Sequence, residues 1–219
     1  MGQAAEMEMG RTKLLVVRHG VTDWNLKGLA QGMADIDLNE EGRRQAEIVA
    51  ATLASFDIDA VLSSDLSRAV HTAEPIAGRH DLGVSEDPDF REVDQGEWTG
   101  LSTDEIKRRW PELWGPARHY SARPGGESPA QVRRRMLHGV ARAVRAHPGE
   151  TVVIVSHGAA IRWLSAEALG YDDRRAARIR GLSNAGVVTM DADIEDGRVV
   201  LGNLVRLDGG TPDLDDPNT

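Results

Sequence analysis

The stretch LLVVRHGVTDWN, residues 14–25, determines how the rest of the sequence is interpreted. Its apolar run from Leu14 to Val17 predicts a buried strand, because short apolar runs are typical of parallel sheets. Arg18 and His19 follow at the carboxyl end of that strand, and Gly20 comes next. Ligands of open parallel sheets bind beyond the carboxyl ends of the strands. These side chains therefore stand where a ligand is expected.

Short apolar runs alternate with amphipathic patterns along the chain. Strands are expected at 13–18, 60–63, 83–86 and 151–156, and helices at 40–55, 66–79, 102–113, 128–147 and 159–169. Such alternation predicts βαβ units. Residues 186–205 predict a hairpin that turns at Asp196-Gly197. We therefore expect an α/β fold, a three-layer αβα sandwich with a mainly parallel central sheet and a lid-like insert.

One domain from about residue 12 to residue 207 is expected, because no repeat or linker interrupts the pattern. Within this domain, residues 101–127 form the lid-like segment. Residues 1–11 are expected to be a flexible N-terminal segment. Residues 208–219 are acidic and contain Pro and Gly, which predicts a disordered tail.

Composition excludes several classes of function. The net charge of −9 argues against binding to nucleic acid or to an anionic membrane. The chain has no cysteine, which excludes disulfides, thiolate chemistry and cysteine-ligated metals. No signal-peptide core and no run of transmembrane length are present, so a cytoplasmic protein is expected. All basic residues except Lys13, Lys27 and Lys107 are arginine, which suits anion recognition inside the fold.

Two further strand ends resemble the first. The strand at 60–63 leads to Arg68 in the first turn of a helix, and the strand at 151–156 leads to His157 and Gly158. Cationic side chains and the two helix N-termini nearby favour an anion, and Gly20 and Gly158 let backbone N–H groups approach it closely. A lone histidine at a strand end is more often a structural hydrogen-bonding partner. The conjunction of all three ends predicts a phosphoryl site.

At this point the chain resembles the histidine phosphatase superfamily, which includes the cofactor-dependent phosphoglycerate mutases. The resemblance covers about residues 13–190, with its motifs in the right order. The segments that carry it are LLVVRHGVTDWN (14–25), QGMADIDLNEEGRRQA (31–46), SSDLSRAVHTA (63–73), FREVDQGEWTG (90–100) and VSHGAAIRWL (155–164).

The resemblance implies a role for each matching residue. His19 is implied as the nucleophile that forms a phosphohistidine. Glu92 is implied as the acid that protonates the leaving oxygen and then as the base that activates water. The remaining implied residues contact the phosphate: Arg18, Arg68, Asn25, Gly158 and the second histidine, His157. No metal and no cofactor are expected, because no zinc-motif spacing is present and two arginines already neutralise the phosphate.

The acid and the lid-like segment each have two interpretations that stay open. On the residues alone, Glu92 is a loop partner for Arg91, and Glu97 is the competing carboxylate. Residues 108–127 are rich in Trp, Tyr and Arg, and they either pack against the fold or read the organic part of the substrate. The candidates for substrate specificity are Gln31, Trp110, Trp114, Arg118 and Arg123.

Three functions are compatible with this sequence. The favoured one is a metal-independent phosphomonoesterase that acts on a phosphorylated small molecule. The second is a phosphoglycerate-type mutase; against it, only 65 positions separate Glu92 from His157, while the mutases considered carry a longer insert. The third is a catalytically idle relative that binds phosphorylated ligands. Gly28, Leu29 and Ala30 precede Gln31 without a charge, which favours a less anionic organic part. The oligomeric state is left open, a homodimer included.

Overall fold

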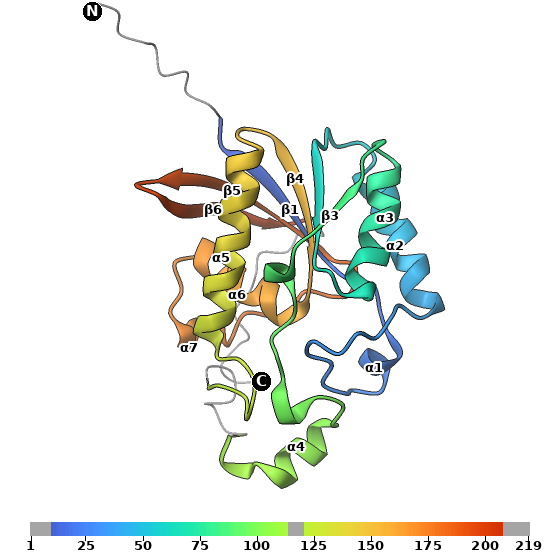
Figure 1. Ribbon diagram of the computed structural model, residues 1–219, viewed down its shortest axis with the longest axis vertical. Coiled ribbons are helices and arrows are strands. Elements are labelled where there is room, and N and C mark those ends of the chain that lie inside the picture. Colours follow the sequence, from blue (N-terminus) through green and yellow to red (C-terminus); the bar gives the residue numbers. More distant parts are fainter. Residues whose placement is uncertain (1–9, 114–120, 208–219) are drawn as a thin grey trace, which may run out of the picture.

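The central sheet has six strands in the order β3-β2-β4-β1-β5-β6 (Figure 1). The computed structural model describes residues 10–113 and 121–207. Strands β3, β2, β4 and β1 are parallel, β5 is antiparallel to β1, and β6 is antiparallel to β5. The strands are β1 (Thr12–Arg18), β2 (Ala60–Ser63), β3 (Val84–Glu86), β4 (Thr151–Ser156), β5 (Val187–Glu195) and β6 (Arg198–Arg206). The predicted α/β fold with a mainly parallel sheet is confirmed.

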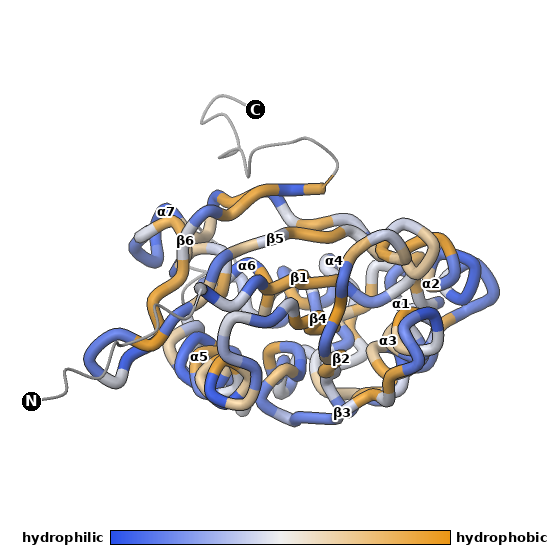
Figure 2. Tube along the Cα trace, turned by 90° about the horizontal axis from the view of Figure 1, so that it is seen from above, coloured by the Kyte–Doolittle hydropathy of each residue, from blue (hydrophilic) through white to orange (hydrophobic). Residues whose placement is uncertain are grey.

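Helices cover both faces of the sheet (Figure 2). Along β1, Leu15 and Val17 belong to the core under α2 and α3, while Leu14 and Val16 belong to the core under α5 and α6. Because successive side chains of a strand point to opposite faces, one apolar run supplies both cores. The longer helices are α2 (Glu40–Leu53), α3 (Ser67–Gly78), α5 (Pro129–Ala146) and α6 (Gly158–Ala168).

The short elements include one correction. Helix α4 (Thr103–Arg109) is shorter than the expected helix at 102–113, and a 3₁₀ turn follows at Pro111–Leu113. Proline disfavours helical backbone in the residue before it, and Trp110 has left the helical region with φ −132° and ψ 62°. The other short elements are α1 (Asp23–Leu26), α7 (Asp173–Ala176) and the 3₁₀ turns Pro88–Phe90 and Gly96–Trp98.

The predicted hairpin is confirmed by β5 and β6. Its turn at Asp196 and Gly197 has φ values of 49° and 76°, and a type I′ turn needs positive φ at both central residues. Within the described residues, no helix is long and apolar enough to cross a membrane. The expectations for residues 1–9 and for the tail at 208–219 lie outside the described part of the chain.

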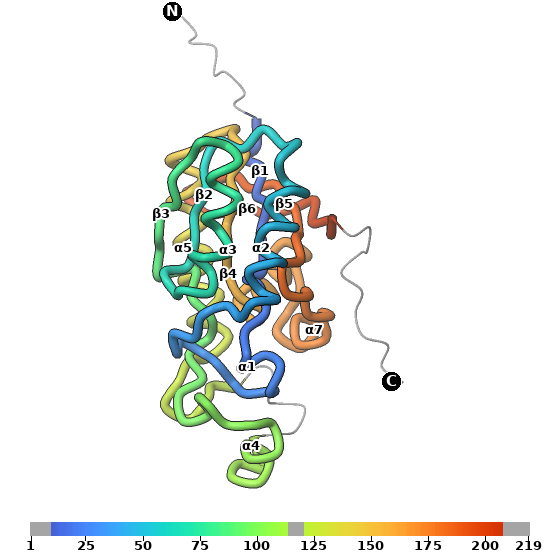
Figure 3. The backbone as a smooth tube through the Cα atoms, turned by 90° about the vertical axis from the view of Figure 1, so that its right-hand side faces the viewer, coloured from blue at the N-terminus to red at the C-terminus, as the bar shows by residue number. Residues whose placement is uncertain are grey.

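Segments from distant parts of the chain gather beyond the carboxyl ends of β1 and β4. Figures 1 and 3 place α1 and α4 there. The segment before α4 is tied to the loop after α1: Ala30 N–H donates to Leu101 O at 3.0 Å, and Gly100 N–H donates to Ala30 O at 2.8 Å. The first part of the lid-like segment is therefore anchored to the residues that follow His19.

Two glycines bring helix α2 against the end of β1. A Cβ on Gly42 would lie 2.1 Å from the Val21 carbonyl oxygen, and one on Gly20 would lie 2.5 Å from the Gly42 carbonyl oxygen. No side chain fits at either place. The Gly20 N–H is donated to Thr72 Oγ1 at 3.0 Å, so the expected approach of that N–H to an anion is replaced by a contact within the fold.

This packing predicts that Gly42→Ala destabilises the protein. Overpacking of this kind costs about 1–3 kcal/mol, and each kcal/mol lowers the melting temperature by roughly 2–4 °C in a chain of this size. Thermal unfolding measures the effect. The matched control is Gly78→Ala at the end of α3, where a Cβ meets no atom within 4 Å. An equal melting temperature for Gly42→Ala and the wild type would contradict the prediction.

Candidate active site

The three strand ends singled out above meet at the carboxyl edge of the sheet. Strands β2, β4 and β1 are neighbours, and Arg68, His157 and His19 follow them. The two histidine rings are 5.1 Å apart between centroids, with their planes inclined by 56°. Both rings and the Arg68 side chain are buried. Hydrogen bonds of about 3 Å let one phosphate contact both rings at this separation.

The His19 ring has a defined tautomer. Its Nδ1 lies 2.6 Å from Gly20 O. A carbonyl oxygen only accepts hydrogen bonds, so Nδ1 carries the proton and Nε2 carries the lone pair. The backbone on either side is also fixed, because His19 N–H donates to Ser156 O at 3.0 Å and Asn184 Nδ2 donates to His19 O at 3.0 Å. The free lone pair on Nε2 is what a nucleophile requires.

The His157 ring has the opposite tautomer. Arg68 Nε donates to His157 Nδ1 at 3.2 Å, so this nitrogen carries the lone pair and Nε2 carries the proton. His157 Nε2 is buried and has no hydrogen-bond partner within the described residues. Buried N–H groups without a partner are rare in folded proteins. The Nε2–H group of His157 therefore marks a place where a ligand oxygen belongs.

Burial and neighbouring cations keep both rings neutral. Burial lowers the pKa of His19 well below 6.5, and the positive charges of Arg68 and Arg18 lower it further. The pKa of His157 is lowered well below 6.5 by burial first and then by Arg68 and His19. A protonated His157 would donate to an anion with a positive charge. Its neutral Nε2–H can donate without that charge.

Arg68 is a buried cation whose guanidinium is partly used by the fold. Its two terminal nitrogens donate to Ala34 O and Gly32 O, each at 2.7 Å. With the bond to His157, three of the five N–H groups are used and two are left. Burial lowers the pKa of Arg68 to about 10, while Glu92 and Asp35 oppose this shift. Arg68 therefore stays positively charged at neutral pH.

Arg18 lies against the start of α6. One terminal nitrogen donates to Leu182 O at 2.5 Å, and its Nε is buried without a hydrogen-bond partner among the described residues. Burial lowers the pKa of Arg18, and the nearby Glu92 opposes this shift. A Cβ on Gly158 would lie 3.3 Å from the guanidinium carbon of Arg18. Glycine at position 158 therefore leaves room for the guanidinium beside the helix.

Glu92 binds the N-terminus of α6. Its carboxylate oxygens accept hydrogen bonds from Val93 N–H at 2.8 Å and from Ala159 and Ala160 N–H at 3.1 Å each. A carboxylate at a helix N-terminus is favoured by the helix dipole. The sequence placed the phosphate at such termini, but the N–H groups of Ala159 and Ala160 are held by this carboxylate.

The hydrogen bonds of Arg91 decide whether Glu92 is its partner, which is one of the alternatives for Glu92. Arg91 pairs with Asp65 through two hydrogen bonds, one of them 2.7 Å between Arg91 Nε and Asp65 Oδ1. The interpretation of Glu92 as a partner for Arg91 is therefore wrong. The competing carboxylate, Glu97, is exposed, and its backbone N–H donates to Pro124 O at 2.9 Å.

Asn25 and Gln31 lie in the loop that follows His19. Asn25 Oδ1 accepts hydrogen bonds from Thr22 N–H at 3.1 Å and from Asn184 Nδ2 at 3.3 Å, so the amide oxygen is used within the fold and the amide N–H₂ group is the part of this side chain that can donate to a ligand. Gln31 is buried, and its Oε1 accepts from Thr22 Oγ1 at 3.0 Å. The contacts of Gln31 therefore serve to hold this loop together.

Two of the specificity candidates, Trp110 and Arg123, lie against Trp98. Its ring centroid lies 6.3 Å from that of Trp110, and the Arg123 guanidinium carbon lies 5.5 Å from its ring. These contacts fit packing of the lid-like segment. Trp114 and Arg118 lie outside the described residues.

Several supporting residues carry no motif of their own. Asn184 ties His19 to Asn25, and Arg135 binds the segment of Glu92. Thr72 links the first strand end to α3, because it accepts from Gly20 N–H and its hydroxyl donates to Arg68 O at 2.7 Å. Only Thr72 had a usable sequence signal: it stands one helical turn after Arg68.

The site has the chemistry of an anion site. In the described part of the chain, no group of three His, Cys, Asp or Glu residues is placed to hold a metal ion. Two guanidinium groups, the buried N–H of His157 and the lone pair of His19 converge at one sheet edge. Guanidinium groups bind phosphate oxygens bidentately. The arrangement combines cationic donors with a nucleophilic nitrogen.

Fold and site together define an α/β protein with a buried cationic site at the carboxyl edge of its sheet. The chain belongs to the histidine phosphatase superfamily, branch 1, whose family model matches residues 14–205. The family resemblance seen in the sequence is confirmed.

Relatives of this chain include phosphatases and mutases. It is 36% identical over 163 residues to phosphoserine phosphatase 1 of Hydrogenobacter thermophilus, covering 73% of this chain and 77% of that protein. It is 31% identical over 208 residues to a probable phosphoglycerate mutase of Yersinia enterocolitica, covering 94% and 96%. The native structure of a mycobacterial glucosyl-3-phosphoglycerate phosphatase matches with a TM-score of 0.82 and 31% identity, covering 91% and 99%.

The tautomers predict a specific NMR pattern. At pH 6.5, long-range ¹H–¹⁵N spectra are expected to show His19 neutral with its proton on Nδ1 and His157 neutral with its proton on Nε2. Assignment uses His19→Asn and His157→Asn. An imidazolium pattern for either ring at this pH would contradict the prediction.

The same lowered pKa values set the direction of a stability change. Below pH 6.5 the unfolded chain protonates these two histidines and the folded chain does not. Their contribution to the free energy of unfolding is therefore complete above pH 6.5 and is lost as the pH falls from there toward the folded-state pKa values. In urea unfolding over this range, the wild type should lose more stability than His157→Asn.

Proposed function

We propose that the protein is a phosphomonoesterase that hydrolyses a phosphorylated small molecule through a phosphohistidine on His19. The observation that carries the proposal is the pair of opposite tautomers. A lone pair on His19 Nε2 lies beside a buried N–H on His157 Nε2 that has no hydrogen-bond partner in the described part of the chain. One nitrogen can attack phosphorus while the other binds an oxygen of the same phosphoryl group.

In the first step, His19 Nε2 forms a bond to phosphorus and the bond from phosphorus to the leaving oxygen breaks. Negative charge on the non-bridging oxygens is stabilised by Arg18 and Arg68 and by the Nε2–H of His157, with Asn25 as a further donor. The leaving oxygen takes a proton from Glu92. In the second step, the Glu92 carboxylate accepts a proton from water, the water oxygen attacks phosphorus, and the bond to His19 breaks.

Glu92 suits this cycle because its environment changes when substrate binds. Without substrate it is held as an acceptor by three N–H groups. A phosphate dianion beside it is a like charge, which favours the protonated carboxyl group. The proposed cycle starts with this carboxyl group protonated, so that it can donate its proton to the leaving oxygen in the first step. The exposed Glu97 remains the alternative acid.

The nature of the acceptor separates a hydrolase from a mutase. A mutase returns the phosphoryl group to the bound organic product, whereas a phosphatase transfers it to water. The short distance in sequence from Glu92 to His157 and the phosphatase names among the relatives support the hydrolase. The names phosphoserine and glucosyl-3-phosphoglycerate both describe phosphate esters of organic molecules. We infer a small phosphomonoester as the substrate class.

The leaving group tests the roles of His19 and Glu92. His19→Ala should abolish turnover with every substrate. Glu92→Gln keeps the hydrogen bonds but cannot deliver a proton, so an alkyl phosphate should react about 10²–10⁴-fold more slowly. Nitrophenyl phosphate needs no acid, so a burst of nitrophenol and then slow turnover are expected.

Rapid acid quench with ³²P-labelled substrate should trap the label on His19 in the Glu92→Gln protein. Equal slowing of alkyl and aryl substrates in the first step would assign the acid to another residue, and Glu97→Gln would then be tested in the same way. Absence of label on His19 would refute the covalent route.

A second experiment separates hydrolysis from isomerisation. Phosphate release from a panel of phosphorylated metabolites should exceed the conversion of 3-phosphoglycerate to 2-phosphoglycerate, with or without the bisphosphate activator. Phosphate release should also persist in a chelator, because the proposed chemistry uses no metal. Isomerisation faster than hydrolysis would favour the mutase, and loss of activity in chelator that Mg²⁺ restores would refute the metal-independent route.

A further inference from the structure

One side chain of α5 holds the backbone around Glu92 through hydrogen bonds to its carbonyl groups. Arg135 donates to the carbonyl oxygens of Asp89 at 2.9 Å, of Arg91 at 2.6 Å and of Glu92 at 2.8 Å. These residues span the 3₁₀ turn at Pro88–Phe90 and the acid itself. One guanidinium group thus fixes the segment of chain from which the Glu92 side chain projects.

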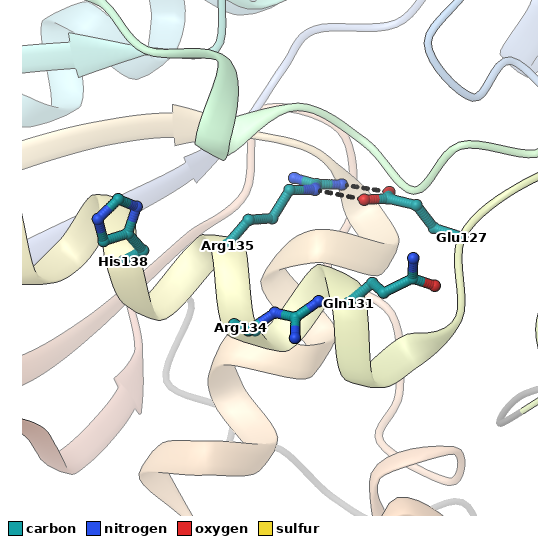
Figure 4. Close-up of a pocket in the computed structure, with 5 residues that line it drawn as sticks. All are labelled: Glu127, Gln131, Arg134, Arg135 and His138. Carbon is teal, nitrogen blue, oxygen red and sulfur yellow. Dashed lines mark hydrogen bonds and ion pairs between the residues drawn. The ribbon is translucent and has the colours of Figure 1, made fainter.

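Arg135 uses its remaining donors on a second carboxylate. Its Nε donates to Glu127 Oε1 at 2.9 Å and a terminal nitrogen donates to Glu127 Oε2 at 2.8 Å (Figure 4). All five N–H groups of the guanidinium are therefore used. The Arg135 and Glu127 side chains are only 14% and 17% exposed. A bidentate pair at this burial depends on geometry that lysine does not reproduce.

Glu127 extends this contact to the far side of the acid. It accepts from Asp94 N–H at 3.0 Å, and its own N–H donates to Asp94 O at 3.0 Å. Burial raises the pKa of Glu127, but the hydrogen bonds from Arg135 and from Asp94 N–H outweigh this and lower it. Glu127 is therefore ionised at neutral pH and fixes the chain two residues after Glu92.

Glycines let the two segments lie directly against each other. A Cβ on Gly126 would lie 2.3 Å from Asp94 O, and one on Gly96 would lie 2.1 Å from Pro124 O. The stretch PGGE at 124–127 thus forms a close-fitting support for residues 94–97. The backbone is immobilised on both sides of Glu92, whereas its carboxylate reaches forward to the N–H groups of α6.

We propose that Arg135, together with Glu127, is the positioning device for the general acid: it fixes the backbone of residues 89–94 so that the Glu92 carboxyl group meets the leaving oxygen. The proposal rests on the phosphatase function given above. Neither residue contacts the reacting atoms, so each acts through Glu92. Misplacement of a catalytic group by about 1 Å costs about 10²-fold in rate.

The dependence of the rate of phosphoenzyme formation on the leaving group tests this role. Arg135→Ala should slow phosphoenzyme formation from an alkyl phosphate by about 10²-fold. It should change phosphoenzyme formation from nitrophenyl phosphate far less. This is the same dependence on the leaving group that is expected for Glu92→Gln. Arg135→Lys keeps a positive charge beside Glu127, but its three N–H donors cannot replace the five hydrogen bonds of the guanidinium. Its alkyl rate should therefore fall between those of the wild type and Arg135→Ala. The matched control is Arg134→Ala. Arg134 lines the same surface pocket of about 460 Å³, together with Gln131 and His138 (Figure 4), but makes none of the contacts to residues 89–92. Its rates should stay within about twofold of the wild type.

A double variant tests whether Arg135 acts through Glu92. In the Glu92→Gln background, adding Arg135→Ala should change the alkyl rate by less than about threefold, because coupled residues are not additive. An equal cost in both backgrounds, or equal slowing of alkyl and aryl substrates by Arg135→Ala, would overturn the positioning role. If Arg135→Ala fails to fold, Arg135→Lys is compared with and without added guanidinium. Guanidinium can enter through the open pocket and should restore the alkyl rate selectively, and no selective restoration would also overturn the proposal.

These outcomes are separable from a failure of the proposed function. In the Arg135 variants, the label from ³²P-substrate should still be trapped on His19. If Glu92→Gln itself shows no dependence on the leaving group, the assignment of the acid fails at that reference variant. If Glu92→Gln behaves as expected and Arg135→Ala does not follow it, only the positioning role fails.

Discussion

The arrangement of the site at the carboxyl edge of the sheet depends on one buried cation in particular, the guanidinium of Arg68. A charge removed from water is stable only when hydrogen bonds and opposite charges replace its hydration. Here the loop after α1 supplies the carbonyl oxygens of Gly32 and Ala34, and His157 supplies Nδ1. The hydrogen bonds that this one side chain requires bring together the ends of β2 and β4 and the loop that follows β1. The same contact sets the tautomer of His157.

The partial compensation of the buried cations explains why the site suits a phosphoryl group. Arg68 has two unused N–H groups, Arg18 has a buried Nε without a hydrogen-bond partner in the described residues, and His157 has a buried Nε2–H in the same condition. Glu92 is the nearby carboxylate that opposes the burial effect on both arginines. A ligand with several acceptor oxygens and two negative charges can accept hydrogen bonds from all of these N–H groups and compensate the charges of both arginines. The chain as a whole is acidic, so this preference arises locally from burial.

Sequence patterns predicted the sheet well because each strand is an apolar run with a visible boundary. The run from Leu14 to Val17 supplies two cores, and helix α5 begins as Ser128 and Pro129 indicate, with its capping box in place. Prediction was wrong where a local rule competed with the pattern, as where Pro111 ends α4 early. The contacts of Arg135 and Asn184 with the carbonyl oxygens of Arg91 and His19 were out of reach, because they join residues more than forty positions apart and depend on backbone groups that every residue possesses.

Glycine illustrates how one residue type carries different physical reasons. Gly20 directly follows His19, yet glycine is required there because the backbone of Gly42 packs against it. Gly158 makes room for the Arg18 guanidinium, and Gly126 makes room for the chain near Glu92. A backbone approaches Gly20 and Gly126 where no Cβ fits, and a side chain lies close to Gly158. A motif that looks like ligand binding in sequence is therefore partly a motif of packing.

The N-terminus of α6 explains how the site can exchange one anion for another. Its Ala159 and Ala160 N–H groups hold the Glu92 carboxylate, and His157 is the residue that begins the helix. In the proposed cycle the protonated Glu92 carries no charge, and the negative charge of the site lies on the phosphoryl oxygens instead. The helix N-terminus and the two arginines then face a carboxylate with one negative charge in one state and a phosphate dianion with two in the other. Protonation of Glu92 in the proposed cycle leaves two negative charges opposite the two arginines, where an ionised carboxylate beside the dianion would leave three.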